Sequence, residues 1–153
     1  MYRLFAGFAL VLTCLAVFLW PSTGSGRSSG PLKEVVLHRS SDGHFYADVL
    51  VNGHSVRFLV DTGAGAVALT EEDARTAEIV IDPARFSSIG EGASGLVRGQ
   101  FVALEKVDLD GFTPADVKAA VVQGASVSLL GQPFLDRLDE IVIRRDVMIL
   151  RYS

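Results

Sequence analysis

The stretch FLVDTGAGAVALT, from Phe58 to Thr70, places one aspartate between two apolar segments. Three apolar residues lead into Asp61, and a second apolar run begins at Ala66. A turn between two such segments is expected to lie against buried structure rather than on an open surface. Three interpretations follow: a catalytic carboxylate, an ordinary turn aspartate beside Gly63, or part of a glycine-rich nucleotide-binding loop.

A β-hairpin is predicted immediately before Asp61. From His44 to Val60, apolar and polar residues alternate with the period of two that is typical of half-buried strands. Asn52-Gly53 divides this stretch, and the dipeptide favours a type I′ turn because both of its residues must adopt positive φ. We therefore expect two antiparallel strands, the second of which delivers Asp61 at its end.

The remainder of the chain predicts an all-β domain with two short helices. Further strands are expected at residues 34–39, 97–108, 117–122, 140–144 and 147–152. One helix is expected at 71–78, where Thr70 and Asp73 resemble a capping box. The other is expected at 132–138, where Pro133 suits the first helical turn.

Two glycine-rich segments match the dinucleotide-binding fingerprint but lack its setting. GEGASG, residues 90–95, follows a poor strand signal (RFSSI) and precedes a strand-like pattern rather than a helix. GAGAVA, residues 63–68, follows a strand of the predicted hairpin, and the next helix begins only after Thr70. The fingerprint needs a parallel βαβ unit with the helix amino terminus at the phosphates. Dinucleotide binding is therefore the weaker interpretation.

Other functional classes find little support. The net charge is −4, and no basic cluster resembles a nucleic-acid footprint. His38, His44 and His54 lack the i, i+4 spacing of a helical metal pair, although a site assembled across strands stays open. No G-x-S-x-G elbow is present, and the single cysteine, Cys14, lies in an apolar amino-terminal run. The sequence thus favours neither a metal site nor a cofactor.

The amino-terminal residues are predicted to tether the domain to a membrane. Residues 1–20 are interpreted as a signal-anchor. Residues 4–20 form an uncharged apolar run whose length is at the lower end of what a transmembrane helix needs to span a bilayer. Residues 21–31 form a Ser/Gly-rich tether. No small-x-small cleavage site closely follows the apolar run, so a retained anchor is favoured over a cleaved signal peptide. The cleaved signal peptide stays open as an alternative. A signal-anchor would place residues 32–153 in the periplasm, although positive-inside counting does not decide the orientation.

Three features, in order, resemble a known protease family. V-D-T-G-A occupies 60–64, the glycine-rich SSIGEGASG occupies 87–95, and L-L-G-Q-P-F-L occupies 129–135. This combination resembles the retropepsin-like (retroviral-type, clan AA) aspartic proteases, and within them the bacterial membrane-anchored type, over roughly residues 44–152. The resemblance implies a retropepsin-like acid-protease half-barrel over residues 32–153. The glycine-rich segment matches the family's flap by position and composition only.

The resemblance also assigns roles to residues. Asp61 would be catalytic, and Thr62, Gly63 and Ala64 would support the active-site loop. Leu130 and Gly131 would run beside that loop as structural residues. The flap would comprise Gly90, Glu91, Gly92, Ala93, Ser94 and Gly95.

Family members of this length carry one Asp-Thr-Gly per chain, so the resemblance implies a homodimer in which each chain supplies one Asp61. The two carboxylates would share a proton and activate a water against a peptide bond, without a metal or a covalent intermediate. The function predicted is that of a membrane-anchored aspartic endopeptidase acting on polypeptides. A catalytically inactive relative, serving as a peptide-binding or dimerisation module, and an anchored β domain of unrelated fold stay open.

Overall fold

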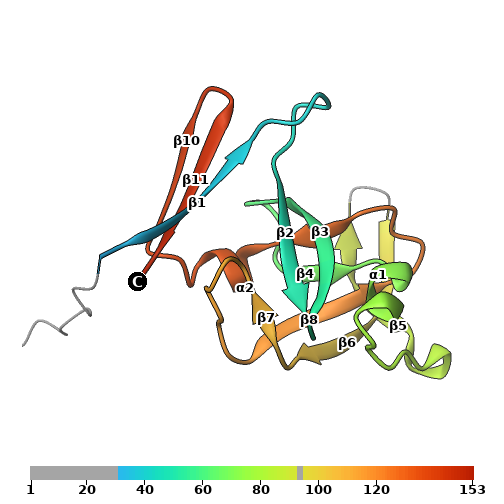
Figure 1. The fold of residues 1–153 in the computed structure, drawn as a ribbon. Helices are drawn as coiled ribbons and strands as arrows, with labels where there is room; N and C mark the ends of the chain where they lie inside the picture. The colour runs from blue at the N-terminus through green and yellow to red at the C-terminus, as the bar shows by residue number, and fades with distance from the viewer. Residues whose placement is uncertain (1–30, 93–94) are drawn as a thin grey trace, which may run out of the picture.

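The computed structural model describes residues 31–92 and 95–153, and these residues form two β-sheets and two short α-helices (Figure 1). The larger sheet has eight strands in the order β5-β6-β8-β4-β9-β3-β2-β7, and the smaller has three in the order β1-β11-β10. The strands are β1 (Lys33–His38), β2 (Tyr46–Val51), β3 (His54–Val60), β4 (Val67–Leu69), β5 (Ser87–Gly92), β6 (Gly95–Leu104), β7 (Val107–Asp108), β8 (Val117–Val122), β9 (Ser128–Leu130), β10 (Glu140–Arg144) and β11 (Val147–Tyr152). The helices are α1 (Glu71–Thr76) and α2 (Gln132–Leu135), with a 3₁₀ turn, η1, at Pro83–Arg85. The prediction of an all-β domain with two short helices is confirmed.

The hairpin before Asp61 forms as predicted from strands β2 and β3. Val51 pairs with His54 across the turn, and Asn52 and Gly53 have φ values of 53° and 86°. Every second side chain of the two strands faces the core, and the buried ones are Ala47, Val49, Val51, Val56, Phe58 and Val60. Because a shift of one residue would expose this whole row, the register is fixed, and β3 ends directly before Asp61.

The short strand β9 lies between β3 and β4 in the centre of the larger sheet. It runs parallel to β3, pairing Leu59 with Leu129 and Val60 with Leu130, and antiparallel to β4. Strand β4 pairs in parallel with β8 on its other side. Both β4 and β9 have three residues, which is too short for a period-two pattern, so neither was predictable as a strand. The two sides of the Asp61 loop are thereby tied to one central strand.

Several boundaries differ from the predictions. Residues 87–92, whose strand signal is poor, form strand β5, because β6 supplies a partner along the whole segment. The single strand predicted at 97–108 is interrupted after Leu104, and the structure has two strands there, β6 and β7. Helix α1 ends at Thr76 rather than at 78, and Glu78 adopts a positive φ of 56°. Helix α2 ends at Leu135 rather than at 138.

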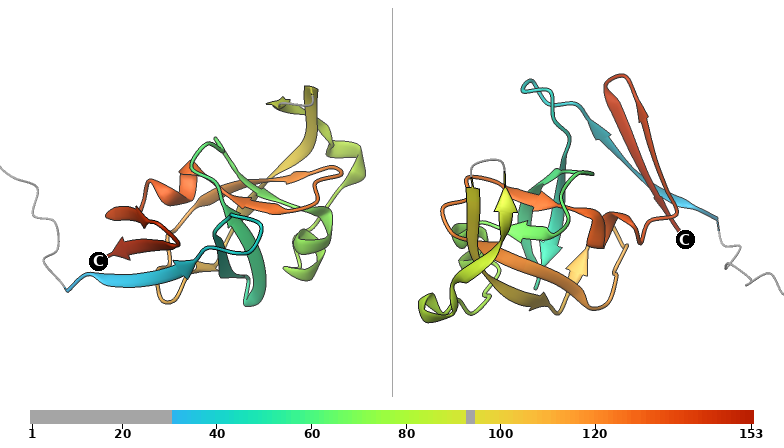
Figure 2. Two further views of the ribbon diagram at one scale, coloured as in Figure 1. Left: turned by 90° about the horizontal axis from the view of Figure 1, so that it is seen from above. Right: turned by 180° about the vertical axis from the view of Figure 1, so that it is seen from behind.

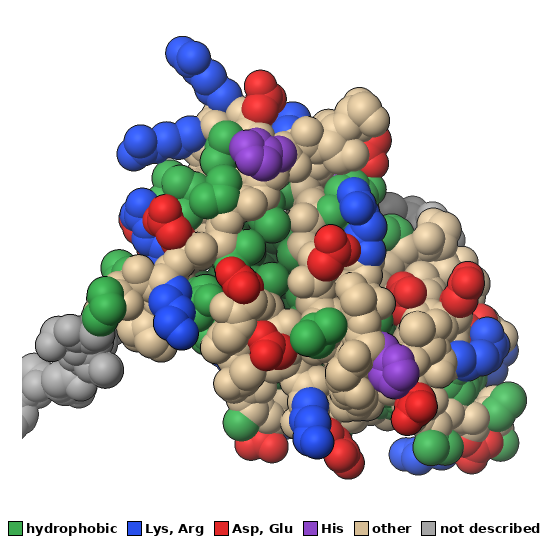
Figure 3. All heavy atoms as spheres, viewed as in Figure 1, with side chains coloured by type: hydrophobic (Ala, Val, Ile, Leu, Met, Phe, Trp, Pro, Cys, Tyr) green, Lys and Arg blue, Asp and Glu red, His purple; other side chains and the backbone are tan. Residues whose placement is uncertain are grey.

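The three-stranded sheet stands beside the larger sheet and contains the C-terminal strand (Figures 1 and 2). Met148, Leu150 and Tyr152 of β11 are buried, while the residues between them are half-exposed. The Tyr152 hydroxyl donates a hydrogen bond to the Asp110 carbonyl at 2.5 Å, and burial raises the pKa of Tyr152. Figure 3 shows apolar side chains in the hollow between the two sheets, with acidic and basic side chains intermixed around it.

The predicted signal-anchor, residues 1–20, and most of the tether lie outside the described residues. Within residues 31–92 and 95–153, no helix has the length and apolar character needed to cross a membrane. The membrane tether therefore stays a prediction from the sequence.

Helix α1 is capped by Thr70, but the cap also recruits a residue from β9. The Asp73 N–H donates to Thr70 Oγ1 at 3.0 Å, as the capping-box pattern predicts. The Thr70 N–H donates to the hydroxyl of Ser128 at 3.0 Å, and that hydroxyl donates to Asp73 Oδ2. Ser128 is fully buried, and it joins the start of α1 to the central strand through these two hydrogen bonds.

Replacing Ser128 with alanine is expected to lower the free energy of unfolding by about 1–3 kcal/mol, because the Thr70 N–H is left without its acceptor in a buried position. Urea unfolding followed by circular dichroism measures this change. Ser126→Ala is the matched control, since Ser126 is exposed, and it should change stability by less than about 0.5 kcal/mol. Equal stabilities of the two variants would contradict this role for Ser128.

Candidate active site

Asp61 lies in a tight loop that joins β3 to β4. Its N–H donates to the carbonyl of Leu130 at 3.1 Å, and its own carbonyl accepts from the Ala64 N–H at 3.2 Å. The Gly63 N–H donates to Asp61 Oδ1 at 2.9 Å. A Cβ atom at Gly63 would lie 3.3 Å from that same oxygen, so a glycine leaves room for this contact. The side-chain carboxylate is therefore oriented by the backbone of its own loop.

The segment directly after β9 packs against the Asp61 loop. A Cβ atom at Gly131 would lie 2.6 Å from the carbonyl oxygen of Ala64 and closer still to that of Ala66, so only glycine fits at this position. The next residue, Gln132, donates its N–H to the Ala64 carbonyl at 2.9 Å and its Nε2 to the Thr62 carbonyl at 2.6 Å. The loop thus rests on two consecutive residues at the start of α2.

A cleft of about 620 Å³ adjoins the Asp61 loop. The loop contributes residues 63–66, and the β5–β6 hairpin contributes Ile89, Gly90, Glu91, Val97 and Phe101. The remaining lining comes from β4, β8, β9 and the segment before β9: Ala68, Ala120, Val122, Ala125, Val127 and Leu129. Most of these side chains are small or apolar, as in sites that bind extended ligands chiefly by shape.

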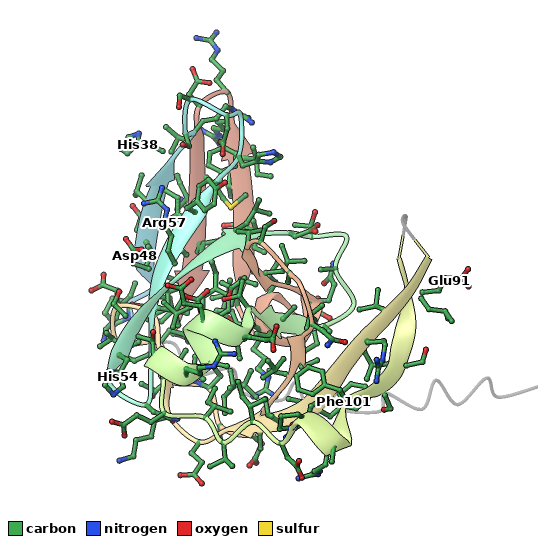
Figure 4. The ribbon with its side chains drawn as sticks, turned by 90° about the vertical axis from the view of Figure 1, so that its right-hand side faces the viewer. His38, Asp48, His54, Arg57, Glu91 and Phe101 are labelled. Atoms are coloured by element: carbon green, nitrogen blue, oxygen red, sulfur yellow. The ribbon has the colours of Figure 1, made fainter. Side chains whose placement is uncertain are left out.

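The β5–β6 hairpin, which contains the segment predicted to be a flap, forms one wall of this cleft. Gly90 and Glu91 line the cleft, and Figure 4 shows Glu91 near the free end of the hairpin. Gly95 begins β6 with a φ of 109°, a backbone conformation that favours glycine. Ala93 and Ser94, also assigned to the flap, lie outside the described residues.

The structure brings most of the predicted site residues together. Asp61, Gly63 and Ala64 share one network of hydrogen bonds with Leu130, and Gly131 packs against the same loop. Thr62 and Gly63 are exposed and Asp61 is half-exposed, which departs from the expectation of a buried turn. The hydrogen bonds that Gln132 donates to the loop were not predicted. The only feature of the sequence that could have indicated them is the position of Gln132 directly after Gly131.

A single chain presents one carboxylate on this loop. Among the described residues that line the cleft, Glu91 carries the only other carboxylate, and it belongs to the opposite wall. Acid–base chemistry by two adjacent carboxylates therefore requires a partner for Asp61 from elsewhere. The exposure of Thr62 and Asp61 in one chain leaves that face of the loop accessible to such a partner.

Comparison with known proteins identifies related sequences and structures. The family model described as "gag-polyprotein putative aspartyl protease" matches residues 47–137, more than half of the chain. The crystal structure of a retropepsin-like aspartic protease from Rickettsia conorii is 31% identical, with a TM-score of 0.66 over 79% of this chain and 91% of that one. The EIAV protease bound to the inhibitor HBY-793 has a TM-score of 0.55 at 20% identity, over 69% of this chain and 97% of that one, and shows the fold alone.

An uncharacterized protein of Rickettsia prowazekii (strain Madrid E) is 34% identical over 120 residues, which are 78% of this chain and 52% of that protein. The chain thus spans about half the length of the curated relatives it matches. Together, the family match and the Rickettsia conorii structure show that this chain belongs to the retropepsin-like aspartic protease family. The predicted retropepsin-like family and fold are confirmed, while the membrane-anchored type stays a prediction.

Gly131→Ala is expected to lower the free energy of unfolding by about 1–3 kcal/mol or more, because the added methyl group overlaps two loop carbonyls. Thermal unfolding of the full chain measures the effect. Gly65→Ala, in the same loop, serves as the control, since a Cβ atom there meets nothing within 4 Å. An unchanged melting temperature for Gly131→Ala would show that the loop does not rest on this residue.

Proposed function

We propose that this protein is an aspartic endopeptidase that acts as a homodimer, with Asp61 from each chain forming the catalytic pair. The observation that carries the proposal is the Asp61 loop: one carboxylate, oriented by the Gly63 N–H, beside an apolar cleft with a hairpin wall. Membership of an aspartic protease family supports peptide hydrolysis as the chemistry. The proposed substrate is a polypeptide in extended conformation.

The requirement for two chains follows from the chemistry. Hydrolysis by this route needs one carboxylate to accept a proton from water and another to donate a proton to the scissile carbonyl. Each chain has a single Asp-Thr-Gly. A two-fold axis at the exposed face of the loop would bring two copies of Asp61 together, because an isologous interface joins the same patch of both chains. Thr62, exposed beside Asp61, would then lie at the same axis.

The two Asp61 carboxylates would titrate as one unit. Like charges at close range cannot both be ionised, so the pair holds a single proton over the working pH range. The ionised carboxylate takes a proton from the bound water as that water attacks the peptide carbonyl. The protonated carboxylate gives its proton to the carbonyl oxygen, and a tetrahedral diol forms. Collapse of the diol, with a proton transferred to the amine, breaks the C–N bond.

The β5–β6 hairpin would close over the substrate. An extended substrate placed in the cleft has backbone N–H and C=O groups that need hydrogen-bond partners. The backbones of the hairpin and of the Asp61 loop would provide these partners. The glycines of the hairpin lower the steric barrier to such closure. Closure would exclude bulk water, apart from the bound nucleophile, and so strengthen the interaction of the carboxylates with the transition state.

We further propose that residues 1–20 anchor this domain to a membrane, with the domain on the periplasmic side. The support for this part is the uncharged apolar run at 4–20 followed by the Ser/Gly-rich tether. Proteolysis by the domain does not depend on it.

The test is the conservative substitution Asp61→Asn, which removes the proton acceptor and keeps the shape of the side chain. Cleavage of a denatured protein is expected to fall by about 100-fold or more, while the dimer size and the unfolding temperature stay unchanged. Asp48→Asn is the matched control, because Asp48 is exposed on β2, outside the cleft lining, and should retain activity (Figure 4).

Wild-type activity that survives in Asp61→Asn would reject the catalytic pair. A wild-type chain that binds peptides and dimerises but cleaves nothing would favour the alternative function, a peptide-binding or dimerisation module on the same fold.

A further inference from the structure

A second cavity, of about 450 Å³, continues from the end of the cleft. It shares Gly65, Ala66 and Phe101 with the cleft. Its other walls come from the start of β8 and from α2 and the turn after it: Asp116, Lys118, Ala119, Pro133 and Arg137. The two cavities therefore adjoin beside the Asp61 loop, and a peptide that extends beyond the first would meet the second.

Phe101 stands at the junction of the two cavities. Its side chain is 65% exposed, which is unusual for a phenylalanine on a strand of the larger sheet. Figure 4 shows Phe101 of β6 toward the base of the β5–β6 hairpin, whereas Glu91 of β5 lies near its free end. Gly65, Ala66 and Ala119 contribute little side-chain volume around it. The junction thus offers an aromatic surface with open space, where the methylene groups of a substrate side chain would pack.

The far wall of the second cavity carries positive charge. The Arg137 guanidinium donates hydrogen bonds to the carbonyls of Ala115 and Asp116, which fix its position. Lys118 is exposed, and among the described residues no ion pair joins it to a carboxylate. Two cations and one carboxylate, Asp116, line this cavity in a chain whose net charge is −4. The local charge therefore favours an anionic group over a cationic one.

The position of the cavity separates it from the chemistry. Residues 61–64 do not line this cavity, so it would meet the substrate away from the scissile bond. Successive side chains of an extended peptide point to opposite faces, and those that enter one wall of the cleft are alternate residues. A charge at this wall therefore selects for one substrate position in each chain's half of the site rather than for acidic peptides in general.

We propose that this second cavity is a distal specificity subsite that binds a glutamate side chain of the substrate, with Lys118 pairing with its carboxylate and Phe101 packing against its methylene groups. The inference rests on the proposed function for the identity of the ligand as a peptide. Lys118 is a specificity-determining residue, and Asp61 retains the chemistry.

The experiment uses the full chain and two matched sets of fluorescein-labelled short peptides. Each peptide has an apolar centre flanked by glutamines, and in one set a single glutamine is replaced with glutamate at each position in turn. At about pH 6, where glutamate is ionised, one position on each side of the scissile bond should favour glutamate over glutamine by about three- to five-fold in both cleavage rate and binding, because each chain of the proposed dimer contributes one such cavity. Binding is measured by fluorescence anisotropy on the Asp61→Asn protein.

Lys118→Glu should reverse the preference at those positions, and Lys118→Gln should abolish it. Lys106→Glu is the matched control, because Lys106 is exposed and lines neither cavity, and it should leave the preference intact. Raising the salt concentration should shrink the wild-type preference, since the ion pair is exposed. Thermal unfolding confirms that each variant is folded.

The two proposals fail separately. Equal binding of the glutamate and glutamine peptides at every position, an absence of peptide binding, or a preference that survives Lys118→Glu would overturn the subsite. A preference in binding that depends on Lys118, without cleavage of any peptide by the wild-type chain, would support the subsite and reject the endopeptidase function.

Discussion

One short strand determines the geometry of the Asp61 loop. Strand β9 lies between β3 and β4, its last residue accepts a hydrogen bond from the Asp61 N–H, and the glycine that follows packs directly against the loop carbonyls. Two segments distant in sequence are therefore held within backbone contact of each other. Ser128, at the other end of β9, ties the same strand to helix α1. A displacement of β9 would change the position of the carboxylate as well as the packing of the core.

This arrangement would supply half of the proposed catalytic site. The loop fixes one carboxylate through a backbone donor, and the cleft beside it offers small apolar walls and a glycine-rich hairpin. General acid and general base must both be present for the proposed hydrolysis. In the proposed dimer this requirement would be met by symmetry, since a second copy would supply an identical loop related by the two-fold axis. Specificity, in contrast, depends on residues that each chain holds by itself, at the far end of the cleft.

The sequence predicted the parts of the structure that repeat a pattern over many residues. The β2–β3 hairpin, its Asn52-Gly53 turn and the Thr70 cap were all visible, because alternation, positive-φ residues and capping chemistry are local. Strands β4 and β9 were not, since three residues carry no period and their pairing partners are distant. The supports at Ser128 and Gln132 were missed for the same reason: both act through contacts with distant residues. The candidate site was predicted from the Asp-Thr-Gly motif in combination with the later Leu-Leu-Gly motif.

Subunit mixing tests the central claim most directly. Wild-type and Asp61→Asn chains are combined in equal amounts at constant total concentration and allowed to exchange, with mass-tagged chains confirming that mixed dimers form. If each site needs one Asp61 from both chains, the activity should fall to about one quarter of that of the pure wild type, because only that fraction of random dimers keeps both carboxylates. An activity of one half, in proportion to the wild-type chains present, would show that each chain acts alone and would contradict the shared site.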